Sequence, residues 1–406
     1  MKIVLFEDNQ CSILRPLGLF RPLFDHYCGS WTLYKLVNLL DRPVRAVIRD
    51  HFLITEDERP TLPSPLVEPH LFLNASIVPD VRYHETLKDI IVAGDAFIMK
   101  SSSRVTAAFV TPGSKIPSHI TANDIGGVLL DMGLPSERLL FKTVNVPFEM
   151  VMSHTRMFDS NLGKRLSAGK FKEERPGVYL GRGAKLAQTV ECDTEHGPVV
   201  IGAGAVIKPF TCLTGPVYIG RKTIVSEHST IGNKTSVEYG CTVGGEITAT
   251  EIEPNSSIQR SYIGHSSIGR WVSFGAGTTM SDDKSTFGTI RIVHQGNRIE
   301  TGLRKLGSII GSLTTTGVST TLFSGKTVGV CSSVYGMAAS NIPSFTSYAK
   351  SFGQVTELNP DQVTTTQERL YKIHGRKQSK RDTELIKRIY TMTSDERKLR
   401  DKQITF

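Results

Sequence analysis

The chain has 406 residues, of which 39% are hydrophobic and 21% are charged. This composition excludes global disorder and a collagen-like protein, and the length predicts two or three domains, each with its own core. No run approaches the roughly 18 apolar residues that span a bilayer, and Glu7 and Asp8 interrupt the apolar start, so we expect a cytoplasmic protein without a membrane partner. The net charge of +9 lies mainly at the end of the chain, because residues 361–406 hold 12 Lys or Arg against 7 Asp or Glu.

The first part of the chain, 1–163, alternates short strands and helices, which predicts an α/β domain. We expect strands at 2–6, 90–93 and 107–110, helices near 30–40 and 148–159, and a loop over the proline-rich residues 59–69. The glycines of this part form no Gly-x-Gly-x-x-Gly or Gly-Lys-Ser/Thr motif that would bind a phosphate. Residues 1–163 by themselves therefore do not indicate which ligand the domain binds. The basic stretch 164–177 lacks periodicity and is interpreted as a linker.

A six-residue repeat organises residues 178–345. Eight aliphatic residues fall on one grid without a gap, namely Ile201, Ile207, Leu213, Ile219, Val225, Ile231, Val237 and Val243. A helix with 3.6 residues per turn would spread this period around its circumference, whereas a coil of short strands that turns on small residues such as Gly or Asn would stack it. The sequence therefore predicts a solenoid whose aliphatic residues point inward.

The repeat continues at Ile258, Ile263, Ile268 and Phe274. An arm near residues 281–304 interrupts it, and we expect it to resume at Leu306, Ser312, Val318, Ser324 and Val330. This hexapeptide pattern resembles the left-handed parallel β-helix of the hexapeptide acyltransferases. The resemblance implies a homotrimer with acetyl-coenzyme A bound between neighbouring subunits.

Residues 356–406 form a third element, because the six-residue repeat stops before it. Leu385, Ile386, Ile389 and Tyr390 fall on one helical stripe, and Ser394 can cap a further short helix. The basic residues are interleaved with acids and have few aromatic neighbours. This favours a helical tail packed on the solenoid or on another subunit over an arm that binds polyanions, and we expect no nucleic-acid partner.

Motifs in both halves follow one another in an order that resembles a single family. They are Phe6-Glu7-Asp8-Asn9, Leu14-Arg15-Pro16-Leu17, Phe20-Arg21-Pro22-Leu23-Phe24-Asp25, Cys28-Gly29, Asn74, Val243-Gly244-Gly245-Glu246, Tyr262-Ile263-Gly264 and Gly275-Ala276-Gly277-Thr278-Thr279. The set resembles the sugar nucleotidyltransferase-like proteins described as an alternative bacterial form of the bifunctional N-acetylglucosamine-1-phosphate uridylyltransferase and glucosamine-1-phosphate acetyltransferase.

The resemblance implies two reactions. A nucleotidyltransferase-like first domain would join a nucleoside triphosphate to a sugar 1-phosphate with Mg²⁺. Arg21 would contact phosphate, Asp25 a metal or the sugar, and Gly29 and Asn74 would belong to the same nucleotide site. The second domain would acetylate an amino sugar, which needs a general base. No protein-held metal site is predicted, because the six cysteines are scattered without a Cys-x-x-Cys pair.

Several polar positions depart from this resemblance. In the first half, Tyr27 stands where an arginine is expected and Lys35 where a glutamate is expected. In the second half, Gln259 stands at the position of the usual catalytic histidine, and an amide cannot accept a proton at neutral pH. The resemblance also implies two cationic side chains in the first half that this sequence lacks.

The missing histidine leaves two interpretations open. His265, one solenoid side away, is the candidate replacement base, and Glu246 and Lys284 are the further catalytic candidates. Alternatively, His265 is an exposed structural side chain, Glu246 is satisfied by backbone amides, and Lys284 is solvated. The protein is then a non-catalytic or regulatory trimeric homologue that binds a sugar nucleotide.

Overall fold

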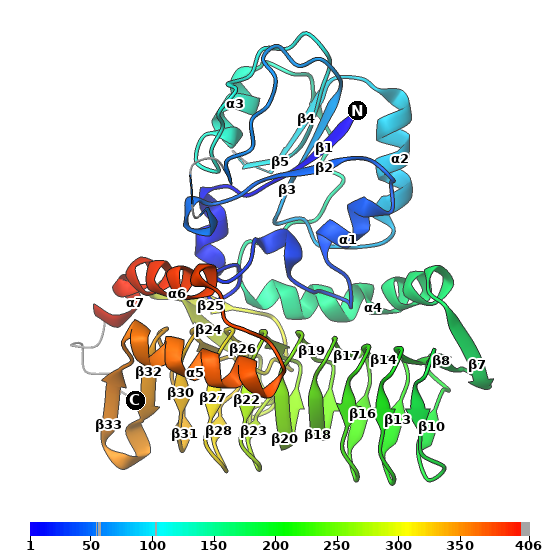
Figure 1. Ribbon diagram of the computed structural model, residues 1–406, viewed down its shortest axis with the longest axis vertical. Helices are drawn as coiled ribbons and strands as arrows, with labels where there is room; N and C mark the ends of the chain where they lie inside the picture. Colours follow the sequence, from blue (N-terminus) through cyan, green and yellow to red (C-terminus); the bar gives the residue numbers. More distant parts are fainter. Residues whose placement is uncertain (54, 56–57, 102–103, 399–406) are drawn as a thin grey trace. The chain divides into compact units, whose positions relative to one another are not determined.

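The computed structural model describes residues 1–53, 55, 58–101 and 104–398. Its chain forms two compact units, Met1–Glu149 and Met150–Phe406 (Figure 1). In the described part of the chain, no helix is both long enough and apolar enough to cross a membrane. The domain boundaries that the sequence suggests, at 163, 178, 345 and 356, stay predictions.

The first unit is built on a six-stranded mixed sheet in the order β2-β1-β3-β5-β4-β6. Its parallel strands are β1 (Lys2–Phe6), β2 (Val44–Val47) and β3 (His70–Asn74). The other strands are β5 (Arg104–Val110) and β4 (Phe97–Ser101), which pair antiparallel with each other, and β6 (Ser136–Glu137); β5 also runs antiparallel to β3. The connections carry α1 (Leu33–Asn38), α2 (Tyr83–Ala93) and α3 (Ile125–Asp131), with the 3₁₀ turns η1 (Asn9–Leu14), η2 (Leu23–Asp25) and η3 (Asp50–Phe52). The predicted α/β domain is confirmed.

The prediction of a strand at 90–93 is wrong, because these residues form the last turn of α2. Val92 is exposed and Leu87 is buried, which is the pattern of an amphipathic helix. Gly94 ends the helix in the left-handed conformation, with φ 68°, and its N–H bonds to the carbonyl of Ile90. A glycine in this place is a common helix stop and was the signal in the sequence.

The segment predicted as a linker holds regular structure. Helix α4 (Phe148–Ala168) extends beyond its predicted end, and β7 (Phe171–Arg175) pairs antiparallel with β8 (Val178–Gly181). Phe158 and Leu162 of α4 pack with Val200 and Tyr218 of the following strands. Burial of these apolar side chains stabilises the helix. The basic residues at its C-terminal end, from 164 onward, gave no sign of a helix in the sequence.

The second unit is a parallel β-solenoid (Figure 1). Strands β11 (Val199–Ile201), β14 (Val217–Ile219) and β17 (Thr235–Val237) pair in register, with Ile201 beside Ile219 and Ile219 beside Val237. Each such coil has three strand sides, so one coil equals three of the predicted repeats. All eight grid aliphatics are buried in one continuous core. The predicted solenoid is therefore confirmed.

The remaining strands of the solenoid are short. They are β9 (Lys185–Leu186), β10 (Glu191–Asp193), β12 (Val206–Ile207), β13 (Cys212–Thr214), β15 (Ile224–Val225), β16 (Thr230–Gly232), β18 (Thr242–Thr248), β19 (Glu251–Ile252), β20 (Ser257–Gly264), β21 (Ser267–Ile268), β22 (Ser273–Phe274), β23 (Thr279–Met280), β26 (Ile309–Ile310), β27 (Thr315–Thr316), β28 (Thr321–Leu322), β29 (Thr327–Val328), β30 (Ser333–Val334), β31 (Met337–Ala338), β32 (Thr346–Ala349) and β33 (Gln354–Glu357). The arm is a hairpin of β24 (Arg291–His294) and β25 (Asn297–Glu300).

The predicted register after the arm is wrong. The inward positions are Ile310, Thr316, Leu322, Val328 and Val334, and Val318 is 75% exposed. The two five-residue steps from Ile258 to Ile268 shorten the coil, so every later inward position shifts. Steps of six residues counted from Phe274 lead to Ile310, which is the residue that pairs with Ile268 across the arm. Steps of six counted from Ile258 lead to Leu306 instead.

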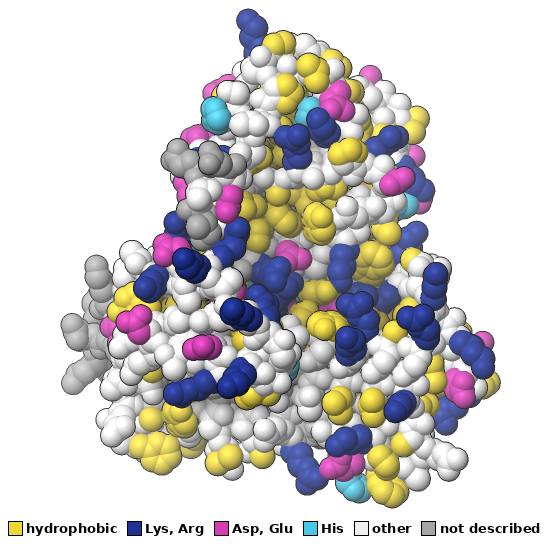
Figure 2. Space-filling view, in the orientation of Figure 1, with side chains coloured by type: hydrophobic (Ala, Val, Ile, Leu, Met, Phe, Trp, Pro, Cys, Tyr) yellow, Lys and Arg dark blue, Asp and Glu magenta, His cyan; other side chains and the backbone are white. Residues whose placement is uncertain are grey.

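The C-terminal tail is helical, as predicted. It contains α5 (Pro360–Ile373), α6 (Lys380–Met392) and α7 (Ser394–Lys398), while residues 399–406 of the predicted tail lie outside the described residues. The Tyr371 ring lies 4.6 Å from the Trp271 ring, and the Tyr390 ring 5.2 Å from the Phe345 ring, measured between centroids, so both longer helices pack on the solenoid. On the face that Figure 2 shows, basic and acidic side chains are interleaved over these helices.

Candidate functional site

Polar residues gather where the parallel strands of the first unit end. Glu7 and Asp8 follow β1, Arg49 follows β2, and Asn74 is the last residue of β3. Arg104 begins β5, which runs antiparallel to β3, so it lies at the same edge. Ligands of α/β sheets bind outside the carboxyl ends of the parallel strands, which makes this edge the candidate site of the first unit.

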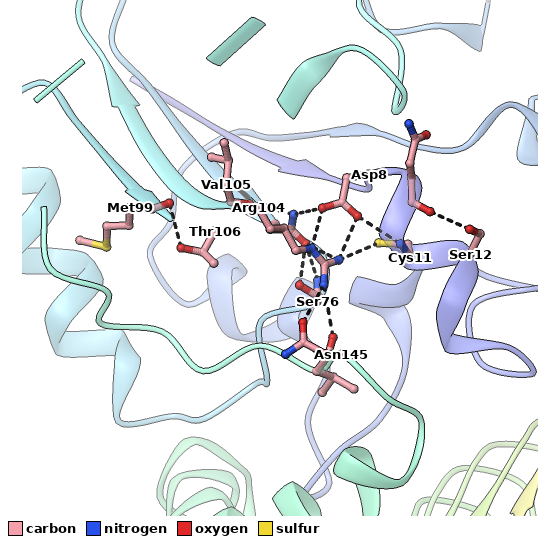
Figure 3. A network of polar contacts seen from close by, with 12 residues as sticks. Asp8, Cys11, Ser12, Ser76, Met99, Arg104, Val105, Thr106 and Asn145 are labelled. Atoms are coloured by element: carbon pink, nitrogen blue, oxygen red, sulfur yellow. Dashed lines mark hydrogen bonds and ion pairs between the residues drawn. The ribbon is translucent and has the colours of Figure 1, made fainter. Parts of the chain in front are cut away.

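A fork of hydrogen bonds joins Asp8 and Arg104 (Figure 3). The Arg104 Nε lies 2.7 Å from Asp8 Oδ2, and its Nη2 lies 2.9 Å from Asp8 Oδ1. The Arg104 Nη1 also donates to Asn145 Oδ1 at 3.3 Å. Burial raises the pKa of the Asp8 carboxyl, but the hydrogen bonds and charge of Arg104, with a hydrogen bond from Asn74, outweigh it and hold this pKa below its usual value. The pair is charged and rigid.

Asn74, a predicted nucleotide-binding residue, is part of this buried network. Its Nδ2 donates to Asp8 Oδ2 at 2.7 Å and to the Val105 carbonyl at 2.9 Å. Its Oδ1 accepts from the backbone N–H and the hydroxyl of Ser76 at 2.9 Å and 2.7 Å. Because both donors and the acceptor are used, a nucleotide contact would have to displace a protein partner. The direct contact stays a prediction.

A second ion pair lies on the other side of β1. Arg49 Nη2 lies 2.9 Å from Glu7 Oε1, and both side chains are buried. Glu7 Oε1 also accepts from the backbone N–H of Leu23 at 2.9 Å, and Arg49 Nη2 donates to the Gly18 carbonyl. The pair therefore holds the loop of residues 14–25, which contains Arg21 and Asp25, against the strand ends.

Arg21 and Asp25 lie together on this loop. Arg21 Nη1 is 3.2 Å from Asp25 Oδ2, and the Arg21 side chain is 46% exposed. Gly29, with φ 59°, lies in a tight turn in which Cys28 and Trp31 exchange backbone hydrogen bonds. The structure thus places one exposed cation and one partly exposed carboxylate above a buried ionic frame. This arrangement suits an anionic ligand that carries its own cation.

Lys35 supplies a cation close to one of the missing ones. Its Nζ lies 2.5 Å from the Tyr27 hydroxyl and 4.3 Å from the centre of the Tyr27 ring. Tyr27 and Lys35 are two of the positions where the sequence departs from the resemblance. The contact places a positive charge beside Tyr27.

The carboxylate of Asp25 is the group near Arg21 that could bind Mg²⁺. Among the described residues, no group of three His, Cys, Asp or Glu could hold a metal ion. Mg²⁺ usually takes one or two carboxylates and completes its shell with water and substrate phosphates. Asp25 is a carboxylate of this kind, so the residues fit a magnesium ion that binds together with a nucleotide.

The second candidate site is a hydrogen-bonded pair at a corner of the solenoid. His265 Nδ1 lies 2.6 Å from Asp282 Oδ2, and the Tyr262 hydroxyl donates to Asp282 Oδ1 at 3.2 Å. A carboxylate partner fixes the proton on Nδ1 and leaves the lone pair on Nε2. The His265 side chain is 23% exposed, so the ring is partly accessible to solvent.

The groups around Asp282 shift its pKa and that of Tyr262. Burial raises the pKa of Asp282, but the hydrogen bond and electrostatic interaction with His265, together with Lys305 and Tyr262, outweigh it and lower this pKa. Burial, the charge of Asp282 and its hydrogen bond raise the pKa of Tyr262 to about 12. Tyr262 therefore stays a hydrogen-bond donor, and Asp282 stays an acceptor for both neighbours.

The other predicted residues of the solenoid lie at different distances from this pair. Glu246 is exposed on β18 and pairs in register with Tyr262 of the next coil. Glu246 and Tyr262 therefore lie side by side on the same sheet of the solenoid. Gln259 is exposed on β20. Lys284 lies in the arm, where its Nζ donates to the Thr289 carbonyl at 2.5 Å. The hydrogen bonds of Lys284 are thus made within the arm.

Four functional candidates were missed from the sequence, namely Glu7 with Arg49, and Asp8 with Arg104. Glu7 and Asp8 were noted as charges that interrupt an apolar run and as part of the motif Phe6-Glu7-Asp8-Asn9, but no functional role was assigned to them. The available signal was their position directly after the first strand, but their arginine partners are 42 and 96 residues away. A fifth candidate, Asp282, was missed in the solenoid.

The first unit is thus an α/β sheet with an arginine-bearing loop at its strand ends, and the second unit is a solenoid of six-residue sides. Residues 3–162 match the family described as sugar nucleotidyl transferase. The bifunctional sugar-1-phosphate nucleotidylyltransferase/acetyltransferase of Sulfurisphaera tokodaii is 32% identical over 125 residues, which cover 30% of this chain and 29% of that protein. The first part of the chain, residues 3–162, is therefore similar to the sugar nucleotidyl transferase family, and the chain spans less than a third of the length of this curated relative.

Solved structures that resemble the chain include acyltransferases. The Arabidopsis UDP-N-acetylglucosamine acyltransferase is 13% identical over 57% of this chain and 82% of its own, with a TM-score of 0.26. The acetyltransferase domain of PglB from Neisseria gonorrhoeae in complex with acetyl coenzyme A is 9% identical over 83% of this chain and 91% of its own, with a TM-score of 0.17. At such low scores, the solenoid is defined by its own strand pairing.

Proposed function

We propose that the first domain is a sugar-1-phosphate nucleotidylyltransferase that makes a nucleotide sugar from a nucleoside triphosphate and a sugar 1-phosphate. The observation that carries the proposal is the loop of residues 14–25, which presents Arg21 and Asp25 at the strand ends of a domain that matches the sugar nucleotidyl transferase family. The reaction is an in-line displacement, so the protein mainly positions the reactants and balances charge.

Arg21 would bind a phosphate of the nucleoside triphosphate. Its guanidinium can keep Asp25 as one partner and offer its other N–H groups to phosphate oxygens. Asp25 would hold Mg²⁺, which when bound neutralises charge on the phosphates. Lys35 adds a positive charge near the same loop, because it contacts Tyr27, two residues after Asp25.

The test is the synthesis of a sugar nucleotide by the purified protein. Each of the four common nucleoside triphosphates is combined with a panel of sugar 1-phosphates, with and without Mg²⁺, and the products are separated by chromatography. Arg21→Ala should lower kcat/KM at least tenfold, whereas Arg82→Ala, at an exposed arginine directly before α2 that pairs with Asp80, should leave it unchanged. Absence of product from every pair would contradict the proposal and favour the non-catalytic homologue.

A second activity, acyl transfer to an amino sugar, is favoured by the His265–Asp282 pair. His265 Nε2 would take the proton from the amine nitrogen as this nitrogen attacks the carbonyl carbon of an acyl thioester such as acetyl-coenzyme A. The carbon–sulfur bond then breaks, and the leaving thiolate receives the proton from His265. Tyr262 and Glu246 would contact the acceptor sugar on the same surface.

This second activity is tested with acetyl-coenzyme A and glucosamine 1-phosphate. His265→Ala should abolish transfer, and Asp282→Asn should lower kcat, because an amide in place of the carboxylate no longer fixes the tautomer and orientation of the His265 ring. His228→Ala is the matched control, since His228 is an exposed histidine at another solenoid corner with φ 56°. Full transfer by His265→Ala would contradict this role.

The assembly and location of the protein belong to the same proposal. We expect a homotrimer in the cytoplasm, in line with the resemblance of the repeat to hexapeptide acyltransferases. Light scattering of the purified protein should give three times the 44.7 kDa of one chain. A monomer at assay concentration would contradict the trimer.

A further inference from the structure

We propose that Arg49, paired with Glu7, is a positioning residue that holds the loop of residues 14–25 in the conformation that presents Arg21 and Asp25. The functional meaning of this role rests on the proposed nucleotidyl transfer. The conformation of the loop itself can be measured without a nucleotide.

The pair grips the loop on both sides of Arg21. Arg49 Nη2 donates at once to Glu7 Oε1 and to the carbonyl of Gly18, three residues before Arg21. The other contact comes from Glu7 Oε1, which accepts from the N–H of Leu23, two residues after Arg21. Glu7 Oε2 also accepts from the N–H of Arg49 at 3.2 Å. The ends of β1 and β2 are thereby joined to the loop through two side chains.

Two histidines hold the same stretch of the loop. His26 Nε2 accepts from the N–H of Gly18 at 2.9 Å, and His51 Nε2 lies 3.2 Å from the carbonyl of Leu19. His51 is in η3, directly after Arg49 and Asp50. The backbone of Gly18 is therefore fixed through both its N–H and its carbonyl, which leaves Arg21 as the exposed part of a restrained segment.

Stability alone does not explain an arginine at this position. The Arg49 side chain is 8% exposed, and its buried Nε and Nη1 have no hydrogen-bond partner among the described residues. Burying a cation with unused donors is costly, and apolar side chains of similar volume often replace buried ion pairs without loss of stability. What an apolar side chain cannot do is bridge a carboxylate and a backbone carbonyl with one nitrogen.

Gly18 lets the guanidinium approach the loop. Its φ of +71° favours glycine, and a Cβ built at this position would lie 2.9 Å from Arg49 Nη2. An alanine would push the guanidinium away from the carbonyl that it holds. The same contact can therefore be broken from the loop side without removing either charge.

The experiment is hydrogen exchange of the full-length protein, measured by mass spectrometry. Glu7→Gln/Arg49→Met removes both charges together, Gly18→Ala displaces the contact from the other side, and Arg49→Lys keeps the charge without the bridge. Peptides covering residues 14–25 should exchange at least tenfold faster in all three variants, while β3 and β5 keep their protection. Arg45→Met is the matched control, because Arg45 is an exposed arginine of β2 that bonds to the Thr61 carbonyl, and it should behave as the wild type.

Nucleotide binding gives the second readout. The dissociation constant of the magnesium nucleoside triphosphate that the wild type binds should rise at least tenfold in the three variants. Unchanged exchange of residues 14–25, or equally faster exchange throughout the first unit, would overturn the positioning role. Restoration of loop protection by Arg49→Lys would also overturn it, since charge alone would then suffice. A wild type that binds no nucleotide contradicts the proposed function, and the loop exchange still decides the role of Arg49.

Discussion

Two consecutive acids at the end of β1 bind arginines on opposite sides of the strand. Glu7 contacts Arg49 after β2, whereas Asp8 contacts Arg104 at the start of β5. Neighbouring side chains of an extended chain point to opposite sides, so adjacent acids can serve different partners. A shift of β1 by one residue would exchange the two positions, and the two pairs therefore fix the register of this strand in the sheet.

Replacing Asp8 by asparagine should destabilise the first unit by about 3 kcal/mol at pH 7, because the substitution leaves the buried Arg104 without a counter-charge. The lowered pKa of Asp8 means that its contribution is present above its ordinary value of 3.8 and is lost as the pH falls through the lower folded value. The difference in unfolding free energy between wild type and Asp8→Asn, measured with urea, should thus shrink below about pH 4. Asp131→Asn, at an exposed acid of α3, should change stability by less than about 0.5 kcal/mol. An equal difference at pH 7 and pH 3 would contradict the charged pair.

At the scale of elements, the backbone conformation at the corners affects the stability of the solenoid. At one corner, residues with positive φ recur in successive coils, at Gly204 (68°), Lys222 (57°) and Gly240 (70°), and other corners carry positive-φ residues as well. We expected Gly or Asn at such turns, but several corners carry larger residues, such as Trp271 and Phe345. The backbone hydrogen bonds between coils hold these residues in a conformation that costs about 1 kcal/mol or more.

Two adjacent coils offer opposite substitutions at the same corner. Lys222→Gly should stabilise the solenoid by about 1 kcal/mol, because Lys222 is exposed and its φ of 57° is strained. Gly240→Ala should destabilise it by about 1–2 kcal/mol, because a Cβ there has φ 70° and would lie 2.8 Å from Asn255 Oδ1. Urea midpoints of the two variants should move in opposite directions. Movement in the same direction would contradict this account of the corners.

The arm depends on the corner that carries His265. Gly307 N–H bonds to the His265 carbonyl, and Leu306 N–H bonds to the Asp282 carbonyl, so the chain leaves and re-enters the coil beside the candidate base. Ile268 pairs with Ile310 across the arm, and a whole number of repeats separates these two positions in the sequence. The insertion therefore preserves the phase of the repeat, and the register shift comes from the shortened coils before it.

At the scale of the whole molecule, two ways of dividing the chain place α4 in different parts. The family match runs to residue 162, which includes most of α4, whereas the compact units divide near its start. From Met150 onward, α4 packs on the solenoid through Phe158 and Leu162 and through buried polar contacts. His154 Nδ1 lies 3.0 Å from Glu251 Oε2, and His154 Nε2 lies 2.6 Å from the Lys234 carbonyl.

Glu251→Ala tests this attachment of α4. The substitution leaves the buried His154 Nδ1 without its hydrogen-bond partner and should lower the stability of the second unit by about 1–3 kcal/mol. Hydrogen exchange of α4 should rise at the same time. Glu227→Ala, at a partly exposed glutamate paired with Lys208, should leave the urea midpoint unchanged. If α4 kept its protection in Glu251→Ala, the apolar contacts alone would hold it.

The amino-acid sequence by itself determined the α/β class of the first unit, the solenoid of the second and the helical tail. These follow from local periodicity, since a six-residue grid excludes a helix and an apolar stripe every 3.6 residues favours one. Arg21 and Asp25 were proposed as site residues because they belong to one short motif, and their roles stay predictions. Only the tertiary structure decided that Glu7 pairs with Arg49, Asp8 with Arg104 and His265 with Asp282. These partners are joined by strand order and by coil stacking, and side chains up to 96 residues apart leave no periodic trace of their contact.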